Sequence, residues 1–464
     1  MVFSSIPFLY YYLPAVLAVY FLVPRQGKNL ILLLASLFFY GWGEPACLPL
    51  MVLSVAQGYV FGLAMEKSKQ QRWKKLWLLL TLACSLGALL WFKYAGFFVG
   101  SFAAFTGIPV PALKIALPIG ISFYTFQIMS YSVDVYWGKT AAQKNPIHLA
   151  AYVSMFPQLI AGPIVRYTDI ARQLERRTHS WEKLSLGIRR FLLGLGKKVL
   201  IANQLGALCG QYQSLHEPSV LFCWLYACAF TLQIYFDFSG YSDMAIGLGR
   251  MLGFDFTENF HYPYVSRSVT EFWRRWHISL GSWFRDYVYI PLGGNRVSRG
   301  KWLRNILVVW MLTGFWHGAA WNFVLWGLWY GLLLLGEKLL WGRGLEGRPV
   351  LSRVYVMLAV IFGFVLFNAA SLSDALDCMS GMLGLGGLPL CSGEALYYLR
   401  SYAVVLILAV VGATPLPARA FRRLGERFEG VFTLLEPVGL ALILLLSTAY
   451  LVDGSFNPFL YFRF

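Results

Sequence analysis

The sequence predicts an all-α integral membrane protein that crosses the bilayer many times. Of its 464 residues, 58% are hydrophobic and only 13% are charged, whereas about a quarter of the residues in a soluble domain are charged. Apolar runs of about twenty residues, the length that spans a bilayer as a helix, recur along the chain. The basic residues collect in short segments between these runs, as the positive-inside rule expects.

Eleven apolar runs are long enough to be candidate transmembrane helices, and the eighth has room for two short helices. They lie at 7–24, 29–43, 48–65, 76–92, 114–136, 185–204, 218–236, 303–336, 352–370, 401–416 and 432–452. Two further apolar pieces, at 147–163 and 238–254, are too short or too polar and are expected to be re-entrant or interfacial helices. We expect one membrane domain covering 1–464.

The charge distribution predicts the orientation. Basic segments alternate with segments almost free of Lys and Arg at 44–47, 93–113, 205–217 and 371–399. Basic loops face the cytoplasm, so both termini are expected to face outward. The net charge of +17 is accounted for by these loops, which makes the lipid bilayer the expected partner and argues against nucleic acid.

A histidine inside an apolar run is the strongest functional signal. His317 lies within Thr313–Asn322 (TGFWHGAAWN), flanked by Gly314 and Gly318, which open space or permit a helix break. Ionisable residues in mid-membrane are costly and mark functional sites. One interpretation is a histidine hydrogen-bonded within a helix bundle. The other is a general base or acyl-accepting group, since a desolvated imidazole stays neutral and can accept a proton.

A second candidate segment, 266–280, combines aromatic, basic and histidine residues. Read as a helix, it has an aromatic face and a basic face, the pattern of an anchor at the headgroups. Alternatively, Arg267, Arg274 or Arg275 binds the phosphates of an anionic donor such as coenzyme A. His277 then lines the passage that leads to His317.

Two carboxylates, Asp237 and Asp243, end the run that begins at 218. Buried carboxylates are stable when paired, and we expect them to be structural partners of Arg or of backbone N–H groups. Their spacing of six residues does not place them on one helix face.

Seven motifs, in order along almost the whole chain, resemble the membrane-bound O-acyltransferase family, and within it the alginate O-acetyltransferase branch. They are LPIGISFYTF at 117–126, FPQLIAGPIVRY at 156–167, FDFSGYSDMAIG at 236–247, FWRRWHISL at 272–280, YIPLGGNR at 289–296, TGFWHGAAW at 313–321 and FNPFLYFRF at 456–464.

The resemblance implies an enzyme in the bacterial inner membrane that moves an acyl group, here acetyl, from a cytoplasmic thioester such as acetyl-CoA to an exported polysaccharide. His317 matches the histidine tied to catalysis in the family, and His277 matches its second characteristic histidine. An extracytoplasmic acetyltransferase is the expected protein partner. No permanently bound cofactor and no metal are expected.

Two alternatives remain at this stage. One is D-alanyl transfer to teichoic acid from a carrier protein, which stays within the family. The other is a transporter or channel that uses Asp237, Asp243 and His317 as an ion path; the absence of an evident internal repeat argues against it.

Overall fold

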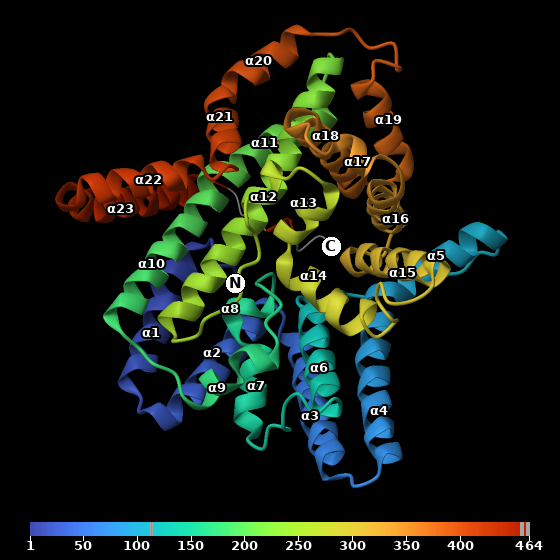
Figure 1. Cartoon of the computed structure of the whole chain (residues 1–464). Helices are drawn as coiled ribbons and strands as arrows, with labels where there is room; N and C mark the ends of the chain where they lie inside the picture. The colour runs from blue at the N-terminus through green and yellow to red at the C-terminus, as the bar shows by residue number, and fades with distance from the viewer. Residues whose placement is uncertain (112, 114, 455–458, 461–464) are drawn as a thin grey trace. The chain divides into compact units, whose positions relative to one another are not determined.

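The computed structural model describes residues 1–111, 113, 115–454 and 459–460 (Figure 1). Every regular element among these residues is helical. The chain forms two compact units: unit 1 comprises 1–191 and 244–257, and unit 2 comprises 192–243 and 258–464. The prediction of one domain over 1–464 stays a prediction.

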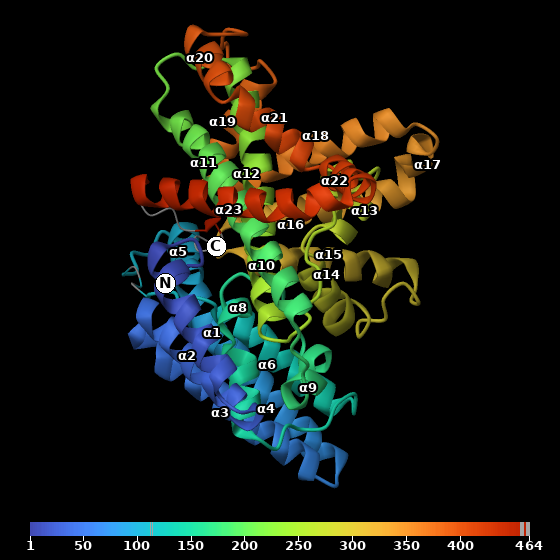
Figure 2. The same ribbon diagram turned by 90° about the vertical axis from the view of Figure 1, so that its left-hand side faces the viewer.

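Unit 1 is built from short and medium helices. These are α1 (Leu13–Leu22), α2 (Lys28–Gly43), α3 (Leu48–Lys67), α4 (Gln71–Leu89), α5 (Ala95–Thr106), α6 (Ile121–Tyr136), α7 (Pro146–Ser154), α8 (Phe156–Leu159) and α9 (Tyr167–Glu175). Helices α3, α4 and α6 pack side by side, as both views show (Figure 1, Figure 2). Gly58 and Gly62 of α3 permit this contact, because an added Cβ at either would lie 2.9 Å from Ile128 or Tyr131 of α6.

Two long helical stretches contribute residues to both units. Helix α10 (Trp181–Gly196) continues through a π-helical turn (Lys197–Ala202) into α11 (Asn203–Gly210). Helix α12 (Val220–Met251) is 32 residues long. Within unit 2, Gly240 of α12 packs on the end of α10, since an added Cβ there would lie 2.8 Å from the Gly194 carbonyl oxygen.

Unit 2 also contains the helices that follow in sequence: α13 (Val269–Arg275), α14 (Ile278–Phe284), α15 (Arg299–His317), α16 (Trp321–Gly336), α17 (Gly342–Leu345), α18 (Pro349–Asn368), α19 (Leu372–Met382), α20 (Gly393–Ser401), α21 (Ala403–Gly412), α22 (Leu416–Arg427) and α23 (Glu429–Asp453). Helices α15 and α16 lie against each other (Figure 1). The core of this unit includes Trp276, Trp326, Tyr330, Phe364 and Phe367.

The multi-pass, all-helical prediction is confirmed. Among the described residues, seven helices are long and apolar enough to cross a membrane, or eight if the bent pair α20 and α21 forms one span. Eleven apolar runs were predicted, but fewer helices reach this length, because in several runs the helix is shorter than the run. The first run, for example, is helical only over Phe8–Leu22, and α2 has 16 residues.

Two predicted boundaries were wrong. Of the run predicted at 114–136, the part that the structure describes, from 115 onward, becomes helical only at Ile121, because Gly120 adopts a left-handed φ of 75°. A side chain at Gly120 would also collide with the Leu159 carbonyl oxygen. The piece at 238–254 is not a separate helix, since α12 continues without a break to Met251. Asp237 and Asp243 therefore lie along one helix rather than at the end of a span.

Candidate active site

His317 is the last residue of α15, where the helix stops and the chain folds back into α16. Gly318 is extended and ends the helix. Gly314 brings α15 onto α16, because an added Cβ would lie 2.1 Å from the Phe323 carbonyl oxygen. An added Cβ at Gly318 would likewise meet the Phe323 ring. The glycines expected to open space or permit a break thus do both, and they fix the place of His317.

Aromatic rings surround the imidazole of His317, which is 3% exposed. Ring centroids of Trp316, Trp326 and Phe367 lie 5.0, 5.1 and 5.3 Å from its own. The ring of His277 is also near, at 6.4 Å between centroids. The structure therefore brings together the two histidines that are 40 residues apart in sequence, in a place shielded from bulk water.

His277 occupies the turn between α13 and α14. Its backbone is left-handed, with φ 44° and ψ 53°, a conformation that costs free energy for a residue other than glycine and is often found at functional sites. The side chain is 2% exposed. Its Nδ1 lies 3.1 Å from Oδ1 of Asn259, and its ring packs edge-on against Phe238 of α12, 4.7 Å between centroids.

A hollow of about 440 Å³ adjoins His277. Its wall includes Trp273, Trp310 and three basic side chains, Arg274, Arg285 and Lys338. Arg285 makes a hydrogen bond to Asp286 at 2.6 Å, which raises the pKa of Arg285 and keeps its guanidinium charged. We call this hollow the histidine chamber. Its wall thus contains both permanently charged side chains and a buried imidazole.

A second hollow, of about 570 Å³, shares Thr270 and Lys338 with the histidine chamber. Its wall carries four basic side chains, Arg267, Lys338, Arg343 and Arg348, together with the carboxylates of Glu337 and Glu346. We call it the basic chamber. Glu337 has a structural task here, because its carboxylate accepts hydrogen bonds from the backbone N–H groups of Val269 and Thr270.

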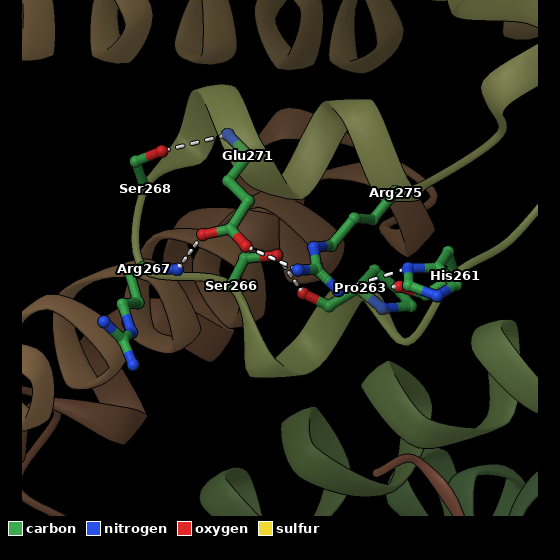
Figure 3. Close-up of polar contacts among 7 residues, drawn as sticks. All are labelled: His261, Pro263, Ser266, Arg267, Ser268, Glu271 and Arg275. Atoms are coloured by element: carbon green, nitrogen blue, oxygen red, sulfur yellow. Dashed lines mark hydrogen bonds and ion pairs between the residues drawn. The ribbon is translucent and has the colours of Figure 1, made fainter. Parts of the chain in front are cut away.

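The three arginines predicted to bind a donor have different places. Arg274 lines the histidine chamber and Arg267 lines the basic chamber. Arg275 lines neither of them: it forms an ion pair with Glu271 at 2.7 Å and a hydrogen bond to the His261 carbonyl oxygen at 3.2 Å (Figure 3). Figure 3 also shows the Arg267 side chain extending away from this cluster.

Glu271 organises the start of α13 (Figure 3). Its carboxylate accepts the backbone N–H of Arg267 at 2.8 Å, while its own backbone N–H donates to Ser268 Oγ at 2.9 Å. The bond to Ser268 Oγ satisfies one of the N–H groups that a helix start leaves open, and the bond from Arg267 holds the residue before Ser268 against the first turn of the helix. The cap holds α13, and with it Arg274, at the chamber wall.

The carboxylates of α12 are paired, as expected; a backbone N–H group is one of the partners, but the charged partners are lysines where arginines were expected. Asp237 lies 2.5 Å from Lys198 Nζ and also accepts the backbone N–H of Leu460 at 2.9 Å. Asp243 lies 2.6 Å from Lys197 Nζ. Both lysines come from the π-helical turn after α10. They support the stretch of α12 that carries Phe238 against His277.

Several site residues were missed by sequence reasoning. Lys197 and Lys198 carried a signal, since a charge inside the apolar run 185–204 requires a partner. Arg285, Lys338 and Asn259 carried none, because only the folded chain brings them to the chambers. No group of three His, Cys, Asp or Glu side chains able to hold a metal ion occurs among the described residues.

The chain belongs to the membrane-bound O-acyltransferase family, whose model matches residues 67–372. It is 39% identical to a protein of Azotobacter vinelandii named probable alginate O-acetylase, over the full length of both chains. It is 34% identical to a peptidoglycan O-acetyltransferase of Helicobacter pylori, covering 86% of this chain and 83% of the relative. A teichoic acid D-alanyltransferase of Bacillus subtilis is more distant, 29% identical over 54% of this chain and 68% of its own.

These relatives make the protein a membrane-bound O-acetyltransferase, as the motifs predicted. The family assignment favours acyl transfer over the transporter alternative, and the greater distance of the D-alanyltransferases favours acetyl over D-alanyl.

Proposed function

We propose that the protein takes the acetyl group of acetyl-CoA, bound from the cytoplasm, and passes it across the membrane for the O-acetylation of an exported polysaccharide such as alginate, peptidoglycan or a related polymer. The observation that carries this proposal is the histidine chamber, in which Arg274, Arg285 and Lys338 share a wall with His277. The polymer class follows the relatives, whose printed names are an alginate O-acetylase and a peptidoglycan O-acetyltransferase.

The charges of the two chambers suit the phosphates of coenzyme A. Guanidinium and ammonium groups form strong, charge-assisted hydrogen bonds with phosphate oxygens. Arg267, Arg343 and Arg348 add three such groups in the adjoining basic chamber. With the nucleotide phosphates held there and by the cations of the histidine chamber, the thioester end would reach His277 in the chamber wall, and His317, which lines neither hollow, has its ring centroid 6.4 Å from that of His277.

The two imidazoles supply the chemistry. As a hydroxyl oxygen attacks the thioester carbonyl carbon, its proton passes to a neutral imidazole and a carbon–oxygen bond forms. The carbon–sulfur bond then breaks, and the departing thiolate takes the proton back from the imidazolium. Because the aromatic rings around His317 exclude water, hydrolysis of the thioester is suppressed. The reaction requires no permanently bound cofactor.

We further propose that the enzyme works in the bacterial inner membrane, with its basic segments, including 267–304, at the cytoplasm. Coenzyme A is too polar to cross hydrocarbon, so only the small acetyl group would pass. An extracytoplasmic acetyltransferase is the proposed partner that completes the transfer to the polymer.

The donor can be tested with the purified, lipid-embedded protein. We expect radiolabel from acetyl-CoA to pass to an acceptor in the presence of the unaltered chain, and not in the presence of the His317→Ala variant. A D-alanyl carrier protein offered in place of acetyl-CoA should support no transfer. Transfer from the carrier but not from acetyl-CoA would replace this proposal by D-alanyl transfer.

A further inference from the structure

Asn259 is a fully buried residue that fastens the strained turn of His277 through both its backbone and its side chain. Its carbonyl oxygen accepts the backbone N–H of Ile278 at 3.0 Å. Its Oδ1 lies 3.1 Å from His277 Nδ1 and accepts from Ser279, whose backbone N–H is at 3.3 Å and whose Oγ is at 2.9 Å. Its Nδ2 donates to Ser242 Oγ at 3.0 Å.

These contacts determine which nitrogen of His277 carries the proton. A backbone N–H can only donate, so the amide atom beside the Ser279 N–H must be the oxygen and not the nitrogen. A carbonyl oxygen can only accept, so His277 Nδ1 is the donor in its contact with Asn259, the shorter of its two polar contacts; the other, to Ser279 Oγ, is 3.4 Å long, and that hydroxyl donates to Asn259 Oδ1 instead. The imidazole therefore has its hydrogen on Nδ1, and its Nε2 has the lone pair.

The surroundings keep this ring uncharged. His277 lies outside the helices long and apolar enough to span a membrane, and burial lowers its pKa to about 3. Phe238 and Trp316 pack against it, at 4.7 and 5.9 Å between ring centroids. A neutral imidazole with a proton on Nδ1 is a base at Nε2.

We propose that Asn259 is a positioning residue, which holds His277 in the tautomer that accepts a proton at Nε2 during acyl transfer. The inference rests on the proposed function. His277 Nε2 takes the proton of the attacking hydroxyl as the carbon–oxygen bond forms, and returns it to the thiolate as the carbon–sulfur bond breaks. His317, whose ring centroid is 6.4 Å away, lies near enough to act on the same reacting group.

The charged groups near His277 do not change the protonation state that we assign to its ring. On α12, Asp237 and Asp243 are each paired with a lysine of the π-helical turn. Among the described residues, Arg274, Arg285 and Lys338 line the chamber beside His277, His317 lies at the end of α15, and Arg275 of α13 is paired with Glu271. Cations disfavour a protonated imidazole, and so they act in the same direction as burial.

Two substitutions of Asn259 separate positioning from a structural role. Asn259→Asp keeps an oxygen for Nδ1–H but adds a negative charge, which raises the pKa of His277. The acid limb of the pH–kcat profile should therefore move to higher pH, with activity retained. Asn259→Leu removes the acceptor, so kcat should fall by about 100-fold or more, while KM for acetyl-CoA changes little.

A second buried asparagine of unit 2 provides the matched control. Asn305 of α15 donates through Nδ2 to the carbonyl oxygens of Leu292 and Gly294. Asn305→Leu should lower the thermal stability without moving the pH profile. If Asn259→Leu behaves like Asn305→Leu, or if Asn259→Asp has an unaltered profile, the positioning role is overturned.

The tautomer itself can be read by nitrogen NMR of histidine-labelled protein, with the His277 signal assigned by its loss in His277→Gln. We expect Nδ1 to give the shift of a protonated ring nitrogen and Nε2 that of an unprotonated one. The opposite pattern would overturn the inference even if the enzyme is active. Absence of acetyl transfer by the unaltered chain would instead contradict the proposed function.

Discussion

The two histidines of the site lie in contrasting surroundings. His317 ends a 19-residue helix and is enclosed by aromatic rings. His277 lies in a left-handed turn between two seven-residue helices, fastened by hydrogen bonds to Asn259. Aromatic enclosure excludes water from a reacting group, whereas a hydrogen-bonded partner fixes the position of a proton. We infer that the surroundings of His317 exclude water from the reaction, whereas those of His277 fix the position of its proton.

Among the substitutions that test this difference between the two histidines, His277→Gln is expected to have the largest effect. Glutamine is polar and of similar length but cannot accept a proton at neutral pH, so kcat for acetyl transfer should fall by roughly 10²- to 10⁴-fold. The variant should still bind acetyl-CoA, which can be measured by equilibrium binding to the lipid-embedded protein. Retention of wild-type kcat would contradict a chemical role for His277.

A second test alters the helix that places His317. Gly314→Ala puts a Cβ against backbone atoms of α16, which cannot yield as a flexible side chain can, so stability should fall by about 1–3 kcal/mol. Gly300 lies in the same helix with nothing within 4 Å of an added Cβ. Gly300→Ala should therefore be neutral or stabilising by up to about 1 kcal/mol. Equal melting temperatures for the two variants would contradict the close α15–α16 contact.

Adjacent arginines of α13 provide a third test. Arg274→Ala removes a cation from the histidine chamber, and the loss of one charge-assisted bond of about 1.5–3 kcal/mol should raise KM for acetyl-CoA roughly tenfold or more. Arg275→Ala breaks the partly exposed pair with Glu271 and should cost at most about 1 kcal/mol of stability, with KM little changed. Equal effects of the two substitutions on KM would contradict the prediction that Arg274 contacts the donor and Arg275 does not.

The smallest expected effect is on the pH dependence of stability. The pKa of His277 is lowered to about 3, against about 6.5 in the unfolded chain, so between these values the unfolded state binds more protons. The contribution of the buried neutral ring is present above about pH 6.5 and is lost as the pH falls towards 3. Thermal unfolding at pH 7.5 and 5 should show a larger loss for the unaltered chain than for His277→Gln. Identical losses would contradict a buried, neutral His277.

The helical class was predictable from the sequence, and local features also drew attention to two histidines and two arginines that the structure places at the candidate site. His317 is conspicuous in an apolar run, and Arg267 and Arg274 lie beside His277 in sequence. The expected end of a span at 236 was wrong, because Asp237 and Asp243 are paired with lysines and α12 continues past them.

What the sequence could not predict depends on tertiary contacts. In the sequence, Asn259 cannot be distinguished from an ordinary loop residue, because only the fold places its amide against His277. Lys338 lies 61 residues beyond His277 in the chain. Arg275 shows the converse: its neighbours in sequence suggested donor binding, whereas in the structure Glu271 and His261 hold its guanidinium. The sequence shows which residue types are present in a segment, but it does not show the direction in which each side chain points.

The central claim is most directly tested by the acetyl content of exported polysaccharide from cells in which His317→Ala replaces the unaltered protein. We expect a variant present in the membrane at normal abundance and a polymer without acetyl groups, measured by the loss of acetyl methyl signals in proton NMR of the purified polymer. Normal acetylation by that variant would contradict the account.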